Sequence, residues 1–409
     1  MRTIFLLGTA AFALAACGGG AGPETAGSVA PPTGQGDVHS FVKPTVAKSY
    51  AAVGGVQHYE YQTRSDRDTQ TAQLYAADAS TVRNSGITIN YDPRDAIFDV
   101  SINRAPATVA NSVRFQDPNH RTAFGGNNEP QVGVPPTAAE KQIQYLEAGS
   151  QTGDAVFPAG AYPVGTPGYK RTLNTFFYQK PGTTTRYVTY GGFVRNDFTT
   201  ERVTETLYDA AGQPLVDASG KTVTRQYLRN GYRLDRAVFA WGEQTTASAI
   251  PRGGTGTYNG DMLATMVYND QLDANAGSPT YFQWITGTNQ TVVDFGAQTV
   301  TTTLNGVVDG PAFDAFTTGA FSMAAGSQFS AKGTATVDLS NVGGFVGRFT
   351  DVTFRAPGST VDRALTIGGS SIDGAFFGPA GEEIGAGFRI VGGTPDQRID
   401  ILGAFTGKK

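Results

Sequence analysis

Short segments in which apolar and polar residues alternate recur along most of the chain, a pattern that is typical of β-strands with one buried face. One such segment, 87–91, is followed by Asp-Pro-Arg-Asp at 92–95 and by a second alternating segment at 98–102. Two alternating segments around a turn sequence predict a β-hairpin. The chain also has 53 glycines among 409 residues and only 16% charged residues. Because glycine allows the tight turns that join strands, the sequence predicts an all-β protein.

The alternation is most regular from residue 241 to the end of the chain. It recurs at 293–304, 335–339, 345–349 and 399–405. An eight-stranded antiparallel barrel, which leaves no sheet edge unpaired, accommodates closely spaced strands of this kind. A sandwich of two sheets has the same periodicity, so the alternation alone does not distinguish a barrel from a sandwich.

One helix is predicted in the N-terminal half. Thr137 and Glu140 have the spacing of a capping box, in which two side chains satisfy the first backbone amides of a helix. Ile143, Tyr145 and Leu146 follow at spacings that suit one face of a helix. We therefore expect a short helix there within an otherwise β domain.

The N-terminus has the pattern of an exported lipoprotein. Arg2 is the only charge before an apolar run at 3–13, and Leu-Ala-Ala-Cys at 14–17 resembles the lipobox of bacterial lipoproteins. The run is too short to cross about 30 Å of hydrocarbon as a helix. Cys17 is the only cysteine, so the mature chain forms no internal disulfide. We expect residues 1–16 to be a signal peptide and Cys17 to carry a lipid that attaches the protein to a membrane.

Residues 17–40 are rich in Gly, Ala and Pro and carry few charges. Such a sequence cannot bury a core, so we expect a flexible linker. By the sorting pattern known for enteric lipoproteins, Gly18 after the lipidated cysteine favours the outer membrane or the cell surface. The rest of the chain divides into a mostly β domain at 41–240 and the barrel domain at 241–409.

Four stretches of the C-terminal part resemble, in the same order, motifs of the barrels of transferrin-binding protein B. The most specific is 374–386, Gly-Ala-Phe-Phe-Gly-Pro-Ala-Gly-Glu-Glu-Ile-Gly-Ala, which is similar to the family signature G-x-F-Y-G-P-x-A-x-E-x-G-G. The others lie at 241–260, 293–304 and 403–405. The signature residues are Gly374, Phe376, Phe377, Gly378, Pro379, Glu383 and Gly385. Phe377 replaces the usual Tyr, and two further positions carry Gly and Ala in place of Ala and Gly.

The resemblance implies a barrel preceded by a mostly β, handle-like domain, the two together forming one lobe of a surface lipoprotein. Typical members of the family have two lobes and capture a host iron-transport protein, whereas this chain has the length of one lobe. The resemblance gives the signature residues a structural role, with Phe376 and Phe377 on opposite faces of a strand. It also implies binding of an extracellular macromolecule or solute, a connection with iron uptake, and transfer to an outer-membrane receptor.

Residue types that carry catalysis or bind metals lack the spacing those functions need. His39, His58 and His120 are far apart, and none has a second ligand at metal-binding spacing. The acidic stretch 270–277 departs from the EF-hand pattern. The adjacent glutamates at 382–383 should point to opposite faces of a strand, and no Gly-x-Ser-x-Gly motif is present. We therefore expect a protein that is not an enzyme and needs no metal or cofactor.

Three functions remain open at this point. The first is a binding module that captures an extracellular macromolecule or solute; the second is a lipocalin-like carrier of a small apolar ligand inside the barrel; the third is a structural envelope lipoprotein. A net charge of −4 without basic runs argues against nucleic acid as a partner. A filled barrel interior would favour the first function over the second. Tyr162, Tyr169 and Tyr258 are candidate exposed anchors for a partner.

Overall fold

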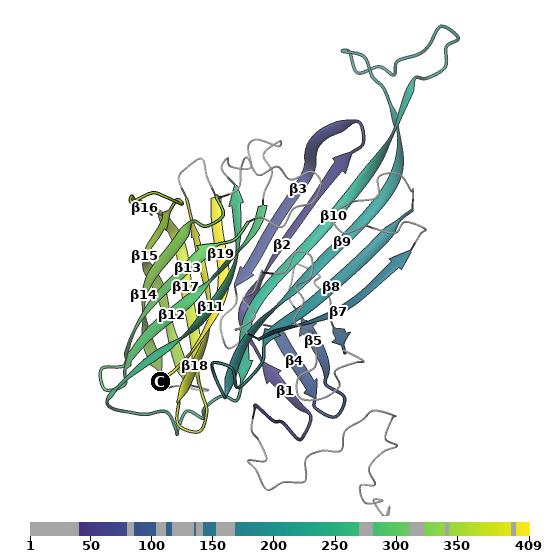
Figure 1. Ribbon diagram of the computed structural model, residues 1–409. Helices are drawn as coiled ribbons and strands as arrows, with labels where there is room; N and C mark the ends of the chain where they lie inside the picture. Colours follow the sequence, from purple (N-terminus) through teal and green to yellow (C-terminus); the bar gives the residue numbers. More distant parts are fainter. Residues whose placement is uncertain are drawn as a thin grey trace, which may run out of the picture.

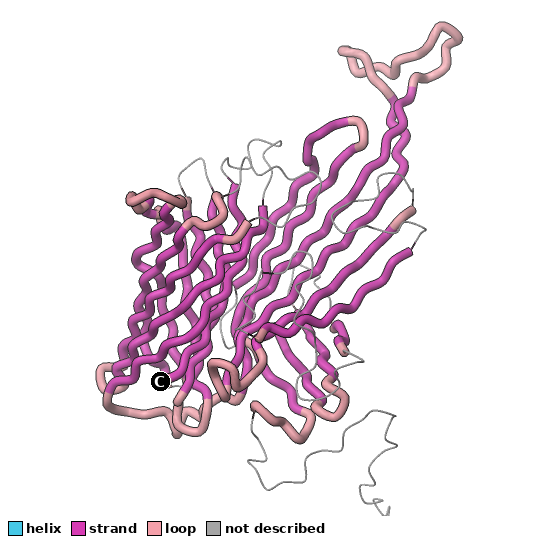
Figure 2. The backbone as a smooth tube through the Cα atoms, in the orientation of Figure 1, coloured by secondary structure: helices cyan, strands magenta, loops and turns pink. Residues whose placement is uncertain are grey.

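The computed structural model describes residues 41–79, 86–103, 112–116, 135, 142–152, 168–269, 281–310, 323–339, 343–393 and 398–409. Every regular element among them is a β-strand (Figure 2), which confirms the all-β fold. Within these ranges, no helix has the length and apolar character that crossing a membrane requires. Cys17 lies outside them.

Six strands of the N-terminal part form one antiparallel sheet, called the handle sheet below. They are β2 (Val53–Arg64), β3 (Arg67–Ala79), β7 (Ile143–Thr152), β8 (Lys170–Gln179), β9 (Val188–Thr206) and β10 (Thr224–Gly242). Their spatial order is β3-β2-β10-β9-β8-β7. The N-terminal strand β2 thus pairs with the last strand of the sheet, β10, and the sheet stands beside the barrel as a broad slanted layer (Figure 1).

A second, smaller sheet covers the lower end of the handle sheet. Its strands are β1 (Lys48–Ala51), β4 (Ile87–Asp92), β5 (Ile97–Ile102) and β6 (Val113–Phe115). β4 and β5 form the hairpin predicted around 92–95. The two sheets enclose a core of aromatic rings, in which Trp241 is fully buried and lies 5.0 Å from Phe41 and 6.4 Å from Phe98 between ring centroids.

The C-terminal part is a closed barrel of eight antiparallel strands, as predicted, and not a sandwich. The strands are β11 (Thr255–Asn269), β12 (Tyr281–Asp294), β13 (Thr299–Val308), β14 (Gln328–Asp338), β15 (Gly344–Arg355), β17 (Ile367–Phe377), β18 (Glu383–Gly392) and β19 (Arg398–Lys408). Each pairs with its neighbour, and the pairs β11–β19 and β14–β15 close the ring. A two-residue strand, β16 (Arg363–Ala364), adds to β15.

Side chains fill the barrel. The inward-facing residues form one buried cluster that includes many aromatic rings. Phe345 and Phe376 lie 5.7 Å apart, and Phe388 lies 5.6 Å from Phe349 and 6.3 Å from Phe405, all between ring centroids. An eight-stranded barrel is narrow enough for its own side chains to occupy it. This packing argues against a carrier that holds a ligand inside the barrel.

The predicted helix is wrong for the part of it that the structure describes. Ile143–Thr152 is the edge strand β7, which pairs with β8 along its whole length. Tyr145 packs on the barrel side of the handle sheet, while Leu146 packs on the opposite side, against the small sheet. Because both faces of the sheet are covered here, apolar residues occupy adjacent positions and imitate helical spacing. Thr137 and Glu140 lie outside the described residues.

Candidate functional site

The handle sheet packs directly against the outer wall of the barrel. One apolar cluster spans the contact, with Phe177 and Val238 from the sheet and Trp284, Phe377 and Leu402 from the barrel. The rings of Trp284 and Phe177 meet edge to face, with centroids 5.7 Å apart. Such a continuous apolar contact joins handle and barrel into one body, because separating them would expose the rings to water.

Two glycines allow the backbones of handle and barrel to approach closely. A Cβ atom added at Gly387 of β18 would lie 2.8 Å from both Cα and N of Gly54 in β2. Contacts of that length with backbone atoms are not relieved by a side-chain rotation. The junction therefore requires glycine at residue 387.

Gly387→Ala is expected to lower the free energy of unfolding by about 1–3 kcal/mol, because the added methyl group pushes β18 away from β2. Urea unfolding followed by tryptophan fluorescence measures the change, since Trp284 lies in the junction. Gly369→Ala is the matched control: Gly369 also lies in a barrel strand, and an added Cβ has open space there. Equal unfolding midpoints for the two variants would contradict the role given to Gly387.

Glu383 links the barrel to the segment that leads into β9. Its side chain is buried, and its Oε1 accepts a hydrogen bond from the Arg186 backbone N–H at 2.6 Å. Its Oε2 accepts from the N–H groups of Tyr187 at 2.6 Å and Val188 at 3.1 Å. Burial raises the pKa of this carboxyl, and the three N–H donors and the charge of Lys408 oppose that rise. Both oxygens thus hold the handle in place.

Three further hydrogen bonds cross the junction. Gln179 donates from Nε2 to Asp261 Oδ2 at 3.1 Å, and Thr184 donates to the same oxygen at 3.2 Å. Gln57 of β2 donates to the backbone carbonyl of Asp400 in β19 at 2.8 Å. These bonds fix the register of the two parts against each other, because a shift along the strands would leave buried polar groups unpaired.

A cavity of about 440 Å³ lies at the rim of the junction. Its lining includes Val42, Lys43, the segment 182–186, Glu383 and Lys408. The carboxylate of Glu383 already binds three backbone amides, so it is engaged in structure and not directed at a ligand. The other polar lining residues are basic or hydroxyl-bearing, namely Lys43, Arg186, Lys408 and the threonines at 183–185.

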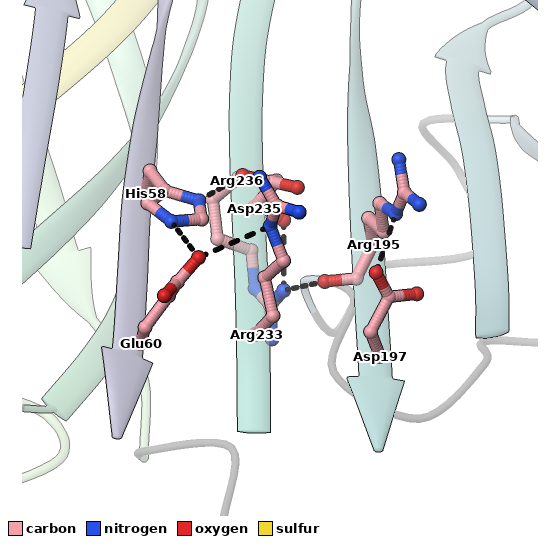
Figure 3. A network of polar contacts seen from close by, with 7 residues as sticks. All are labelled: His58, Glu60, Arg195, Asp197, Arg233, Asp235 and Arg236. Carbon is pink, nitrogen blue, oxygen red and sulfur yellow. Dashed lines mark hydrogen bonds and ion pairs between the residues drawn. The ribbon is translucent and has the colours of Figure 1, made fainter. Parts of the chain in front are cut away.

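A buried polar network lies on the face of the handle sheet opposite to the barrel (Figure 3). His58 of β2 and Asp235 of β10 are directly paired across the two strands, with 2.5 Å between Nδ1 and Oδ1. His58 Nε2 lies 3.0 Å from Glu60 Oε1, which also lies 3.2 Å from Nε of Arg233. Only 4% of His58 is exposed, and Asp235 is fully buried.

Two carboxylates determine the protonation of His58. Burial alone lowers the pKa of the imidazole, but the hydrogen bonds and negative charges of Asp235 and Glu60 outweigh burial and raise the pKa above 6.5. A carboxylate occupies each ring nitrogen, so the imidazolium cross-links the strands and has no nitrogen available to act as a general base.

The network around His58 makes the free energy of unfolding decrease as the pH rises. Because the folded pKa of His58 is raised, its contribution is fully present below about pH 6.5 and is lost as pH rises through the folded pKa. The slope is at most about 1.4 kcal/mol per pH unit. Urea unfolding at a series of pH values measures it. His58→Gln should abolish the slope, whereas His39→Gln and His120→Gln should retain it; a slope that persists in His58→Gln would contradict this assignment.

The structure places the signature residues at the lower end of the barrel, beside the handle. Phe376 packs in the barrel interior and Phe377 packs in the junction, so the two rings face opposite sides. Gly378 has φ of +89°, which favours glycine, and a Cβ at Gly374 would meet the Phe345 ring at 2.0 Å. A Cβ at Gly385 would lie 2.8 Å from Val188. The exposed Pro379 follows in the turn that leads to Glu383.

Two of the three tyrosines predicted as exposed anchors, Tyr169 and Tyr258, are buried. Tyr258 is fully buried and donates from its hydroxyl to the Gly381 carbonyl at 2.7 Å, and Tyr169 is buried beside Phe198. Both are core residues, because Tyr258 lies within β11 and Tyr169 directly precedes β8. Tyr162 lies outside the described residues.

Sequence reasoning missed the His58–Asp235 pair. The two residues are 177 positions apart, and no motif connects them; only the β2–β10 pairing brings them together. Sequence reasoning did include Glu383, but not its partners in the handle. Of the described residues, no group of three or more His, Cys, Asp or Glu side chains is placed to hold a metal ion.

The barrel is the part of the chain that matches a known protein family. Residues 250–409 match the family described as C-lobe and N-lobe beta barrels of Tf-binding protein B. No curated protein matches the chain.

Three similar solved structures are transferrin-binding proteins B. A point mutant from Haemophilus parasuis Hp5 is 13% identical, with 87% of this chain and 76% of that chain covered and a TM-score of 0.28. Intact Ap-TbpB, with N and C lobes, is 12% identical, with coverage of 89% and 77% and a TM-score of 0.29. The isotype 1 protein from serogroup B Neisseria meningitidis is 11% identical, with coverage of 90% and 77% and a TM-score of 0.22.

All three structures are distant from this chain in sequence, at 11–13% identity. The family match rests instead on the barrel, in which the signature at 374–386 lies and whose eight-stranded closure the structure shows. The resemblance predicted from that signature is therefore confirmed, and the chain carries a barrel domain of the transferrin-binding protein B type.

Proposed function

We propose that this chain is a lipid-anchored protein of the outer membrane or cell surface that binds an extracellular protein and is not an enzyme. Residues 1–16 would be the signal peptide and 17–40 the lipidated cysteine with its linker. Residues 41–240 would be the handle-like domain and 241–409 the barrel domain. A bound partner would pass to a receptor in the outer membrane.

The main support for this proposal is the barrel. It is of the transferrin-binding protein B type, and its own side chains fill its interior. A filled barrel leaves the outer surfaces and loops as the places where a ligand can bind, and rigid β-sheets hold such loops in fixed positions. The firm junction between handle and barrel supports a binding surface shared by both parts. The packed interior disfavours the small-ligand carrier as the alternative function.

The description of the matched family suggests which partner to test first. The matched barrels are described by their occurrence in Tf-binding protein B, so transferrin is the first probe, and iron uptake is the process that the binding would serve. A structural envelope lipoprotein without a ligand is the remaining alternative. A direct binding measurement distinguishes a protein that binds a partner from a structural envelope lipoprotein.

The test uses the full chain, purified in detergent and immobilised. It is exposed to iron-loaded and iron-free transferrin and then to growth medium and host fluid, with and without a chelator. We expect retention of one protein, unaffected by the chelator, and no turnover in a panel of esterase, phosphatase and glycosidase substrates. No retained protein would favour the envelope role. Loss with the chelator would contradict metal-free binding, and turnover would contradict the non-enzymatic function.

A further inference from the structure

Strands β9 and β10 extend beyond the rest of the handle sheet. β8 pairs with β9 only as far as Thr199, and β2 pairs with β10 only as far as Arg229. Among the described residues, the outer parts, 203–206 and 224–227, pair as strands only with each other, and Ser65 N–H donates to the Leu228 carbonyl at their base. They form a two-stranded arm that rises from the sheet and ends in a loop, seen at the upper right of Figures 1 and 2. A ribbon of two strands is marginally stable by itself.

Charged side chains support the base of the arm. The Arg64 guanidinium lies 3.5 Å from the centroid of the Tyr227 ring. Glu205 accepts from Arg64 at 2.9 Å and from Arg225 at 2.8 Å, and Asp66 binds Arg64 through both carboxylate oxygens. Single exposed ion pairs contribute little, whereas a network of this kind holds the ribbon in one direction.

The end of the arm, residues 207–223, is called the tip and contains a short repeat. Leu-Tyr-Asp-Ala-Ala-Gly-Gln-Pro at 207–214 is followed by Leu-Val-Asp-Ala-Ser-Gly-Lys-Thr at 215–222. In each copy the aspartate Oδ1 accepts two backbone N–H groups of its own turn, and a glycine with positive φ completes the turn. Both turns are therefore fixed by the same local chemistry.

Three backbone hydrogen bonds join the two turns into one unit. Leu207 N–H donates to Val223 at 3.0 Å, Val223 N–H donates to Leu215 at 2.8 Å, and Leu215 N–H donates to Leu207 at 2.8 Å. The ring of bonds closes on itself. The tip is thus an ordered cap, and the directions of its side chains are set by its backbone.

This ordered cap presents apolar side chains to water. Tyr208 and Val216 are each 59% exposed and Leu215 is 39% exposed. They are close in the chain, while the other large exposed apolar residues of the described part, Val46, Val307, Val346 and Val361, are scattered. Apolar side chains at the end of an arm add nothing to a core, and an ordered cap that exposes three of them between residues 208 and 216 offers a contact surface.

Charges surround the apolar residues of the tip. Asp209 and Asp217 are exposed, and Lys221 is the only basic residue between 207 and 223. A hydrogen bond from the Ser219 side chain, together with the backbone N–H groups of Lys221 and Ser219, holds the pKa of Asp217 below its usual value. The tip therefore carries fixed negative charge at its rim. An anionic bilayer would repel it, whereas a protein with basic side chains around an apolar pocket would complement it.

We infer that the tip is a docking surface for a protein partner that offers an apolar pocket rimmed by basic side chains. This inference rests on the proposed function, since it places the contact of the captured protein. Tyr208, Leu215 and Val216 enter the pocket, and Asp209 and Asp217 face the basic rim. The supported arm holds the tip clear of the sheet, so a bulky partner can reach it.

The test compares two triple variants of the full chain in the binding assay described above. Tyr208→Ser, Leu215→Ser and Val216→Ser remove the apolar side chains of the tip. Val307→Ser, Val346→Ser and Val361→Ser remove an equal number of exposed apolar side chains from the barrel. The tip variant should bind the captured protein at least about tenfold more weakly, because central apolar anchors dominate interface energies. The barrel variant should bind as the wild type does.

Further measurements separate the remaining outcomes. Circular dichroism should give the same melting temperature for both variants, because the altered residues are exposed. A photo-reactive amino acid at 216 should cross-link to the captured protein, whereas one at 361 should not, and high salt should weaken binding.

Equal binding by wild type and tip variant would overturn the inference and leave the proposed function standing. Wild type that captures no protein would overturn both. Tip-dependent flotation with phosphatidylglycerol vesicles would assign the tip to a membrane and overturn the inference.

Discussion

Cys17→Ser is expected to move the protein completely from the membrane fraction into the soluble fraction. Under the proposed function, only acyl chains on this residue would hold the mature chain, because the apolar run at 3–13 would be removed with the signal peptide. Burial of each acyl CH₂ contributes about 0.8 kcal/mol, so several chains make attachment stable and their loss abolishes it. Fractionation after an alkaline wash, with metabolic labelling by an alkyne fatty acid, measures both attachment and the lipid.

Gly18→Ala is the matched control for this substitution. It changes the next residue and keeps the cysteine, so the protein should stay in the membrane fraction and keep the label. Fatty-acid label on Cys17→Ser would show that the lipid is elsewhere. An unlabelled wild-type protein would show that the chain is not a lipoprotein. Either result would contradict the anchor at Cys17.

Glu383→Ala is expected to lower the free energy of unfolding by about 3 kcal/mol. The substitution removes the acceptor of three backbone N–H groups, and those of Tyr187 and Val188 would remain without a partner at the junction. The loss should appear first where handle meets barrel. Urea unfolding followed by tryptophan fluorescence detects it, because Trp284 packs against Phe177 there.

Two companion variants separate the buried carboxylate from its surroundings. Glu382→Ala alters the neighbouring exposed glutamate, whose Oε2 accepts only the Ala380 N–H of its own turn, and should cost less than about 1 kcal/mol. Glu383→Gln keeps the size but turns an amide N–H group toward N–H donors, so most of the loss should persist. Similar unfolding midpoints for Glu383→Ala and Glu382→Ala would contradict the role of Glu383 as the link between barrel and handle.

The alternation of apolar residues was sufficient to predict the fold class, and the resemblance of 374–386 to the family signature favoured a barrel over a sandwich. Strands such as β13, with buried residues at every second position, face a filled interior on one side and solvent on the other. The pattern failed at β7, where Tyr145 and Leu146 belong to different cores. Periodicity indicates a strand only where one face is exposed, and the handle sheet is covered on both faces along part of its length.

The candidate site was less accessible to sequence reasoning, because its residues come from distant strands. The signature placed Glu383 in a connection of the barrel, but its partners at 186–188 lie almost two hundred residues earlier. His58 appeared as an isolated histidine, and only the strand pairing gives it Asp235 as a neighbour. The tip contains two turn sequences, Asp-Ala-Ala-Gly at 209–212 and Asp-Ala-Ser-Gly at 217–220, whereas its exposure depends on how far β9 and β10 extend beyond their neighbours. Burial and pairing are properties of the assembled sheet.

The pairing of β2 with β10 has a consequence for the order in which the chain can fold. Residues 53–64 pair locally with β3, but their second neighbour, β10, supplies its partners only at 229–240, and β11 closes the barrel only with β19 at 398–408. Contacts so far apart in sequence make folding slow, since a long loop must close before the pairing stabilises it. A chain crossing a membrane from its N-terminus would keep the handle sheet incomplete until residue 242 and the barrel incomplete until residue 408. Its exposed strand edges would then need protection from aggregation until residue 408 has emerged.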